Sequence, residues 1–366
     1  MNFLEIIKSP ITNLPIIYKG SFREMLRDKI LRFGEIIDSS SDLSDSVDGM
    51  DFNDSRFKER SRILRQGILK TLDIYYTGDP SGAFKHLSNT LRATNISGFL
   101  NKNYELPEMT NLYRIRKSDG NYPLTKEDLF HIPFQTRSRV NTQRFSIPGL
   151  PSLYVANSVY VAWEELQRPA ISEMQVARLS NNYSLKLLDL TSDIFSRNSQ
   201  LIDNASHGWD LLYRVTVWPL VAACSVKVIE TNDPFKPEYI IPQLLLQWVN
   251  KNMVSGIKYS SSHIDLSDSE HDGHFYNIVF PVQTFEMENG YCRILQNAFK
   301  STQILPLQLR QFITQSDRLD HQASISSAVN PDINSITLIK GAMQPYSSTI
   351  FGIAEHNLKG LELESF

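Results

Sequence analysis

Cysteine, basic charge excess and long apolar runs are all scarce in this chain. Its 366 residues include two cysteines, too few for a disulfide framework and typical of a reducing compartment. The formal net charge of -3 argues against a dedicated nucleic-acid-binding surface, because such surfaces carry a basic excess. No apolar run approaches the roughly 18 residues that a membrane-spanning helix needs, and the N-terminal MNFLEIIKSP lacks a signal-peptide pattern. We therefore expect a cytoplasmic protein that binds neither membranes nor nucleic acids.

The common motifs of nucleotide and hydrolase chemistry are also missing. The chain has no G-x-x-x-x-G-K-[ST] phosphate loop, no G-x-G-x-x-G after a strand and no G-x-S-x-G elbow. A polar loop holds three histidines and three aspartates, without an H-E-x-x-H or a cysteine pair to support a metal site. We therefore interpret it as a solvated loop and expect no metal; its residues are His263, His271, His274, Asp265, Asp268 and Asp272.

The N-terminal third of the chain has helical periodicity. Apolar residues recur at three- and four-residue steps over 24–37, and a second such pattern covers 56–78. A third helix is expected to begin near Ser81, which can serve as its N-cap. Between the first two helices, 38–55 is rich in Ser and Asp and is expected to be an acidic loop. Residues 1–105 are therefore predicted to form an N-terminal helical module.

From Leu106 onward, short strand-like runs alternate irregularly with helical stretches. This arrangement lacks the regular alternation of a doubly wound parallel sheet, so we predict an α+β fold. The predicted strands are 111–116, 152–156, 184–190, 256–261 and 277–282, and the predicted helices are 158–167 and 238–252.

The predicted regions that follow the helical module are a catalytic domain, 106–300, and a C-terminal extension, 301–366. A helical run is expected over 298–312, and 316–335 is interpreted as a polar linker. No element is assigned to the tail after it.

The run LYRIR carries two arginines on one side of a predicted strand. Side chains alternate between the faces of a strand, so Arg114 and Arg116 share a face and Tyr113 and Ile115 point the other way. A desolvated guanidinium needs an anionic partner. Two hypotheses follow: a structural salt bridge, or a fork that grips a phosphate or ribose group.

The stretch NTQRFSIPGLPSLYVANSVYVAWEEL ends on two adjacent acids, Glu164 and Glu165. On a helix these side chains point about 100° apart, so they cannot both face one ligand. Periodicity favours Glu165 as the inward-facing acid. Without other context we interpret the two as a solvated acid pair, because glutamate is mostly exposed.

Hydroxyl side chains follow the predicted strand in SGIKYSSSHI. Ser260, Ser261 and Ser262 stand at its end, where hydroxyls can orient a polar ligand. Such residues can equally do no more than terminate a strand.

Arg, Glu and Ser occur in that order in these stretches, and the chain thereby resembles the RES-domain family, which is named after the three residue types. The resemblance covers roughly residues 110–285. The family carries a glutamate eleven residues after the tyrosine of its Leu-Tyr-x-Ala run, which is Tyr154 here, and this spacing selects Glu165. A Gly-Ile-x-Tyr-x-Ser block selects Ser261. The other matches are Tyr113-Arg114, the block Gln143–Ser146, Gly149, Leu153–Ala156 and Asn277.

The chain departs from the family pattern at two positions in one block. Gln143 stands where a glycine is expected and Ser146 where an asparagine is expected. These departures concern the local turn and one hydrogen bond to the ligand.

The resemblance implies an ADP-ribosyltransferase-like mixed β core and the activity of bacterial toxins that consume NAD or transfer ADP-ribose. NAD would be the substrate, and a small antitoxin or immunity protein that blocks the cleft would be the partner. The implied catalytic residues are Arg114, Glu165 and Ser261, and the implied NAD-binding residues are Arg144, Phe145, Ser146, Tyr154 and Asn277.

The chemistry of NAD cleavage suits these residue types. Breaking the nicotinamide–ribose bond develops positive charge on the ribose, which the carboxylate of Glu165 would stabilise. Arg114, supported by Arg144, would hold the pyrophosphate. Tyr154 or Phe145 would stack on nicotinamide or belong to the core. Ser261 would bond the ribose or hold the glutamate.

Two other functions use the same residues. ADP-ribose would be transferred to a macromolecule instead of to water or phosphate, or a degenerate domain would bind a nucleotide or partner without turnover. A separate hypothesis concerns the N-terminal helices, which would be a regulator, a homo-oligomer surface or a docking site.

Overall fold

The computed structural model describes most of the chain. The described residues are 1–41, 43, 52–96, 105–118, 122–196, 208–230, 232–251, 254–264, 271–285, 289–307, 329–339 and 341–366. None of the helices within these ranges combines the length and apolar character required for crossing a bilayer. Helices and a large sheet together make the fold α+β, as predicted.

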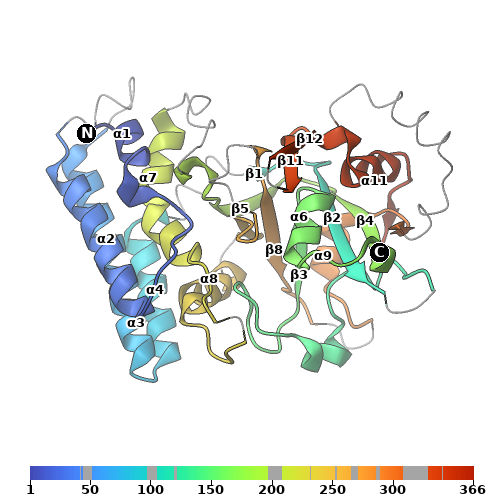
Figure 1. Cartoon of the computed structure of the whole chain (residues 1–366). Coiled ribbons are helices and arrows are strands. Elements are labelled where there is room, and N and C mark those ends of the chain that lie inside the picture. Colours follow the sequence, from blue (N-terminus) through green and yellow to red (C-terminus); the bar gives the residue numbers. More distant parts are fainter. Residues whose placement is uncertain are drawn as a thin grey trace. The chain divides into compact units, whose positions relative to one another are not determined.

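The chain divides into two compact units, each assembled from three segments (Figure 1). Unit 1 comprises Met1–Tyr104, Thr142–Ile147 and Lys186–Val254, and unit 2 comprises Glu105–Asn141, Pro148–Leu185 and Ser255–Phe366. This division differs from the predicted regions. Two segments from the middle of the chain pack with the N-terminal helices, and the predicted C-terminal extension is an integral part of unit 2, because its strands pair with earlier strands there.

Unit 1 is mainly helical. The helices expected over 24–37 and 56–78 are confirmed, and the third begins at Pro80 and not after Ser81, because the Asp79 carboxylate accepts from the Gly82 N–H and caps it. The helices are α1 (Phe3–Ile7), α2 (Phe22–Ser39), α3 (Asp54–Tyr76), α4 (Pro80–Ala93), α7 (Gly208–Cys224) and α8 (Ile240–Lys251). The short 3-10 turns are η1 (Pro10–Thr12), η5 (Asp193–Phe195) and η7 (Pro237–Tyr239), and β5 (Leu185–Leu190) begins at the boundary between the units.

Aromatic stacking and close helix contacts hold unit 1 together. Phe33 of α2 stacks on Trp218 of α7 with ring centroids 4.2 Å apart, and the Trp218 indole donates to the Thr12 carbonyl at 3.0 Å. A Cβ at Gly67 would lie 2.2 Å from a Thr90 side-chain atom, so glycine allows α3 and α4 to approach. Half of the predicted acidic loop 38–55, namely residues 42 and 44–51, lies outside the described residues.

Unit 2 contains a curved sheet with strand order β6-β8-β3-β2-β4-β9-β13, and β10 also pairs with β4. Its strands β8, β3, β2 and β4 are labelled in Figure 1. The pairs along this order are antiparallel. A second sheet has the order β12-β11-β7. The strands are β1 (Glu105–Leu106), β2 (Asn111–Lys117), β3 (Ser152–Ala156), β4 (Met174–Asn181), β6 (Gly256–Ser260), β7 (Asp272–Gly273), β8 (Tyr276–Pro281), β9 (Phe299–Ser301), β10 (Leu305–Pro306), β11 (Ile333–Ile339), β12 (Ala342–Pro345) and β13 (Glu364–Ser365).

Helices of unit 2 are short and follow or precede these strands. They are α6 (Val159–Glu165), α9 (Arg293–Ala298), α11 (Ile350–Lys359) and the 3-10 turns η3 (Phe134–Arg139), η4 (Ile171–Glu173) and η9 (Tyr346–Ser348). The five predicted strands and both predicted helices are confirmed within a few residues. The prediction of a helix over 298–312 is wrong for the described residues 299–307. The chain is extended there because Phe299 and Ser301 pair with β4, and Leu305 pairs with it too.

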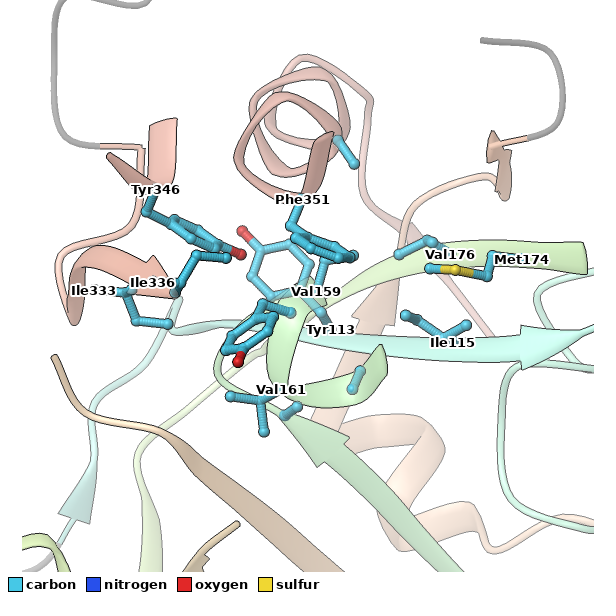
Figure 2. Packing of buried hydrophobic residues seen from close by; sticks show 14 of the residues in the cluster. Tyr113, Ile115, Val159, Val161, Met174, Val176, Ile333, Ile336, Tyr346 and Phe351 are labelled. Carbon is cyan, nitrogen blue, oxygen red and sulfur yellow. The ribbon is translucent and has the colours of Figure 1, made fainter. Parts of the chain in front are cut away.

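The C-terminal segment, which had no predicted elements, forms part of the unit 2 core. Figure 2 shows Tyr113 of β2 and Val159 of α6 facing Tyr346 and Phe351 of this segment. The same cluster includes Met174 and other apolar side chains of β4, a strand that was not predicted. Helix α6 is therefore packed between the main sheet and α11.

Candidate functional site

Helix α6 connects strand β3 to the acidic pair. The Ser158 hydroxyl accepts from the Val161 N–H at 3.0 Å and caps the helix directly after β3. The helix ends at Glu165, and the backbone then turns through two positive φ angles, 60° at Gln167 and 55° at Arg168. The position of Glu165 is thus set by a short helix with defined ends.

Glu165 lies in a cluster with Ser261 and Asn277. Its Oε1 atom accepts from the Ser261 hydroxyl at 2.7 Å and from the Asn277 side-chain amide at 2.9 Å. Its Oε2 atom lies 3.9 Å from Nε2 of His263, and the side chain is 30% exposed. Both hydrogen bonds from the described residues therefore fall on Oε1, and Oε2 accepts none from them.

Strand pairing brings the two donors together. Asn277 lies on β8, opposite Ala156 of β3 and Tyr259 of β6. Ser261 follows β6 directly, and its N–H donates to the Phe275 carbonyl at 3.0 Å, which continues the pairing of the two strands. Ser261 and Asn277 therefore meet at one end of the sheet, where α6 ends.

Glu164 has different surroundings. Both of its carboxylate oxygens accept from the Arg168 guanidinium, at 2.9 Å each. The carboxylate is 4% exposed and Arg168 is 50% exposed, and the guanidinium lies over the Trp163 ring. The interpretation of the two acids as a solvated pair is wrong for Glu164, because the turn after α6 returns Arg168 to cover it. The more buried acid is Glu164 and not Glu165, which periodicity favoured as the inward-facing one.

Arg114 is a half-buried cation on β2. Its Nη1 atom donates to the Tyr154 carbonyl at 2.6 Å, near the one residue pair, Tyr113 and Ala156, that joins β2 to β3. Burial, and then the nearby charge of Arg116, lowers the pKa of Arg114 to about 10. Within the described residues it forms no ion pair with a carboxylate and no hydrogen bond to the Glu165 cluster.

The other predicted NAD-binding residues have contacts inside their own unit. In unit 1, Arg144 donates to the Cys224 carbonyl at 2.9 Å and lies over the Tyr239 ring, and Phe145 is 1% exposed. Ser146 and Gln143, the two departures from the family pattern, bond each other twice at 2.9 Å, which closes the local turn. In unit 2, burial raises the pKa of the half-buried Tyr154.

The histidine loop provides one residue at the site. His263 faces Glu165, whereas the His271 ring makes an edge-to-face contact with Phe275. Asp265 and Asp268 lie outside the described residues. Among the described residues no group of three or more His, Cys, Asp or Glu side chains is arranged to hold a metal ion.

Sequence reasoning missed a second carboxylate beside α6. Glu355 of α11 is 0% exposed and accepts from the Val159 N–H at 2.8 Å. The signal available in the sequence was a glutamate on the apolar face of a helical pattern, but its partner lies 196 positions away.

Comparison with known proteins gives one informative similarity. No family model and no solved structure matches the chain. A protein of Bacillus subtilis (strain 168) named putative toxin YopC is 32% identical over 253 residues, which are 64% of this chain and 56% of that protein. The chain thus spans little more than half the length of this relative, and membership of the RES-domain family stays a prediction.

Proposed function

We propose that this chain is a toxin-like enzyme that breaks the nicotinamide–ribose bond of NAD, with Glu165 as the catalytic carboxylate. The observation that carries the proposal is the arrangement of that carboxylate: two donors hold Oε1 while Oε2 is left for a ligand. The resemblance to the RES-domain family supplies the substrate. The similarity to a protein named as a putative toxin supports the biological class.

The reaction needs little beyond a fixed negative charge. As the bond to C1′ of the ribose breaks, the bonding pair leaves with nicotinamide, which departs as a neutral molecule and needs no proton. Positive charge then develops on the ribose, where a nearby carboxylate stabilises it. Water adds to C1′ and releases one proton, giving ADP-ribose. Ser261 and Asn277 keep the carboxylate oriented, which removes the cost of reorganising it during the reaction.

Arg114 fits the role of an anion-binding residue. It is a half-buried guanidinium that has no carboxylate partner among the described residues, and its pKa is lowered to about 10 by desolvation and by Arg116. A partly desolvated cation of this kind gains from a bound anion. We assign it to the pyrophosphate, which requires that the substrate extend from the Glu165 cluster to β2.

The direct test is release of nicotinamide from NAD by the purified chain. Glu165→Gln keeps the size of the side chain and removes its charge. Glu173→Gln is a matched control, because Glu173 is 48% exposed and its ion pair with Lys117 is long, at 3.8 Å. We expect release by the wild type and the control and none by Glu165→Gln. Equal release by all three proteins would refute the proposed role of Glu165.

The products identify the acceptor of ADP-ribose. Free ADP-ribose indicates hydrolysis, and a phosphorylated product formed only with added phosphate indicates phosphorolysis. Mass added to a protein in a bacterial extract indicates transfer to a macromolecule. NAD binding by calorimetry without release of nicotinamide would support a non-catalytic domain instead. Growth arrest with loss of cellular NAD upon expression, relieved by Glu165→Gln, tests the toxin-like function.

A further inference from the structure

Glu355 is a fully buried carboxylate whose two oxygens are both occupied. Its Oε1 accepts from the Val159 N–H at 2.8 Å and from the Tyr346 hydroxyl. Its Oε2 accepts from the side-chain amide of Asn330 at 3.0 Å. The Tyr113 hydroxyl of β2 also interacts with this carboxylate. Burying a carboxyl group is costly unless hydrogen-bonding partners surround it. Several polar groups surround Glu355 and hold it in this position.

The main effect of this arrangement falls on the first turn of α6. Glu355 satisfies the Val159 N–H, and the Tyr346 hydroxyl interacts with the backbone of Tyr160. The Ser158 hydroxyl satisfies the Val161 N–H. The first N–H groups of a helix have no partner within the helix. In α6 the C-terminal segment supplies partners for Val159 and Tyr160, and Ser158 supplies one for Val161.

The same segment also holds the loop that leads into α6. Asn330 donates to the Asn157 carbonyl at 3.0 Å, in addition to its bond with Glu355. Asp332 accepts from the Asn157 amide and from the Tyr276 hydroxyl, both at 3.1 Å. The loop, the start of α6 and the start of β8 are thus tied to one short stretch of chain.

Helix α6 needs this support because it is short. Seven residues form about two turns, far fewer than an isolated helix requires to be stable in water. Glu165 is its last residue, so any change in the axis of α6 moves the Glu165 carboxylate relative to Ser261 and Asn277.

We infer that Glu355, together with Tyr346 and Asn330, is a positioning residue for the reaction: it fixes the N-terminus of α6 and thereby the orientation of Glu165 at the other end. This inference rests on the proposed function for its catalytic part. Its structural part, the anchoring of α6 by the C-terminal segment, is testable without any activity.

The test compares Glu355→Gln and Tyr346→Phe with Glu362→Gln, a control at an exposed position of the same segment. Hydrogen exchange of peptides that cover 157–166 reports the anchoring of α6. We expect exchange there to become about tenfold faster in the first two variants, which corresponds to the loss of about 1.4 kcal/mol. Nicotinamide release should show a kcat lowered about a hundredfold with KM within about twofold of wild type, since small misplacements of a catalytic group act on the transition state.

The outcomes separate this inference from the proposed function. Unchanged exchange over 157–166 in both variants overturns the anchoring. Faster exchange with unchanged kcat, or an increase in KM alone, overturns the catalytic positioning. If the wild type releases no nicotinamide, the proposed function fails, and the exchange result still decides whether Glu355 anchors α6. Tyr346→Phe keeps the carboxylate, so it gives a result even if Glu355→Gln does not fold.

Discussion

The two ends of α6 lie against two carboxylates whose surroundings differ. At the N-terminal end, Glu355 is 0% exposed and donors occupy both of its oxygens. At the C-terminal end, Glu165 is 30% exposed and both of its donors converge on one oxygen. We call the first carboxylate closed, because hydrogen bonds from the protein reach both of its oxygens. We call the second open, because hydrogen bonds from the described residues reach only one of its oxygens.

This difference indicates how the chain separates structure from chemistry. A carboxylate whose hydrogen-bonding capacity is used up within the protein can stabilise a helix but has no atom for a substrate. A carboxylate held by one oxygen keeps its orientation and can still act on a ligand. Glu164 belongs to the closed class, because Arg168 occupies both of its oxygens.

The largest effect should come from removing the charge of the open carboxylate. We expect Glu165→Gln to lower nicotinamide release about a thousandfold, a loss typical of a group that stabilises transition-state charge. Its thermal midpoint should stay near that of wild type, because the amide keeps the hydroxyl bond from Ser261. Release kinetics and thermal unfolding measure the two quantities. A large loss of stability would instead assign Glu165 to the closed class.

The closed carboxylate should appear in the pH dependence of stability. Burial raises the pKa of Glu355 to about 7 from 4.5, against the opposing effect of its hydrogen bonds. As pH rises between these values, the unfolded chain releases the proton while the folded chain retains it. The free energy of unfolding should therefore fall by about 3 kcal/mol over this interval, and the contribution is fully lost above pH 7.

Glu355→Gln provides the control for that pH dependence, because the variant lacks this titration. Urea unfolding of both proteins from pH 4.5 to 8 should show a wild-type advantage that shrinks as pH rises. Parallel curves would mean that Glu355 does not titrate in this interval.

A smaller effect is expected from the donors to Glu165. Ser261→Ala and Asn277→Ala each remove one hydrogen bond to a charged group, so each should lower kcat about tenfold. Because both bonds fall on the same oxygen, the double variant should lose less than the product of the two effects. Strictly multiplicative losses in a double-mutant cycle would indicate that the two residues act on the substrate independently.

The smallest effect should come from Glu164. In Glu164→Gln the Arg168 guanidinium loses its partner but is half-exposed, so water can solvate it. We expect a stability loss of about 1 kcal/mol by urea unfolding and nicotinamide release within about twofold of wild type. A loss of activity comparable to that of Glu165→Gln would mean that the two acids have been assigned the wrong roles.

Much of the local structure around the site could be predicted from the sequence. Alternation predicted that Tyr113 and Ile115 would face away from Arg114, and both lie in the apolar core of unit 2. Helical geometry predicted that the two acids would point in different directions, and they do: Glu164 pairs with Arg168 and Glu165 contacts Ser261. These features depend on residues a few positions apart, so periodicity reveals them.

The partners of the carboxylates could not be predicted from periodicity. Ser261 lies 96 positions from Glu165, Asn277 lies 112 positions from it, and Val159 lies 196 positions from Glu355. The same limit applies to the segment after residue 298, whose strands exist because they pair with β4. Local propensity carries no information about such contacts.

The sequence by itself determined the α+β character, the position of α6 after β3, and the different directions of the two acids at the end of α6. Only the tertiary structure decided which carboxylate is open and which is closed, and that the C-terminal segment anchors α6. The physical reason is that a carboxylate's role depends on how many donors reach its two oxygens. In this chain those donors come from strands and helices that meet only when unit 2 folds.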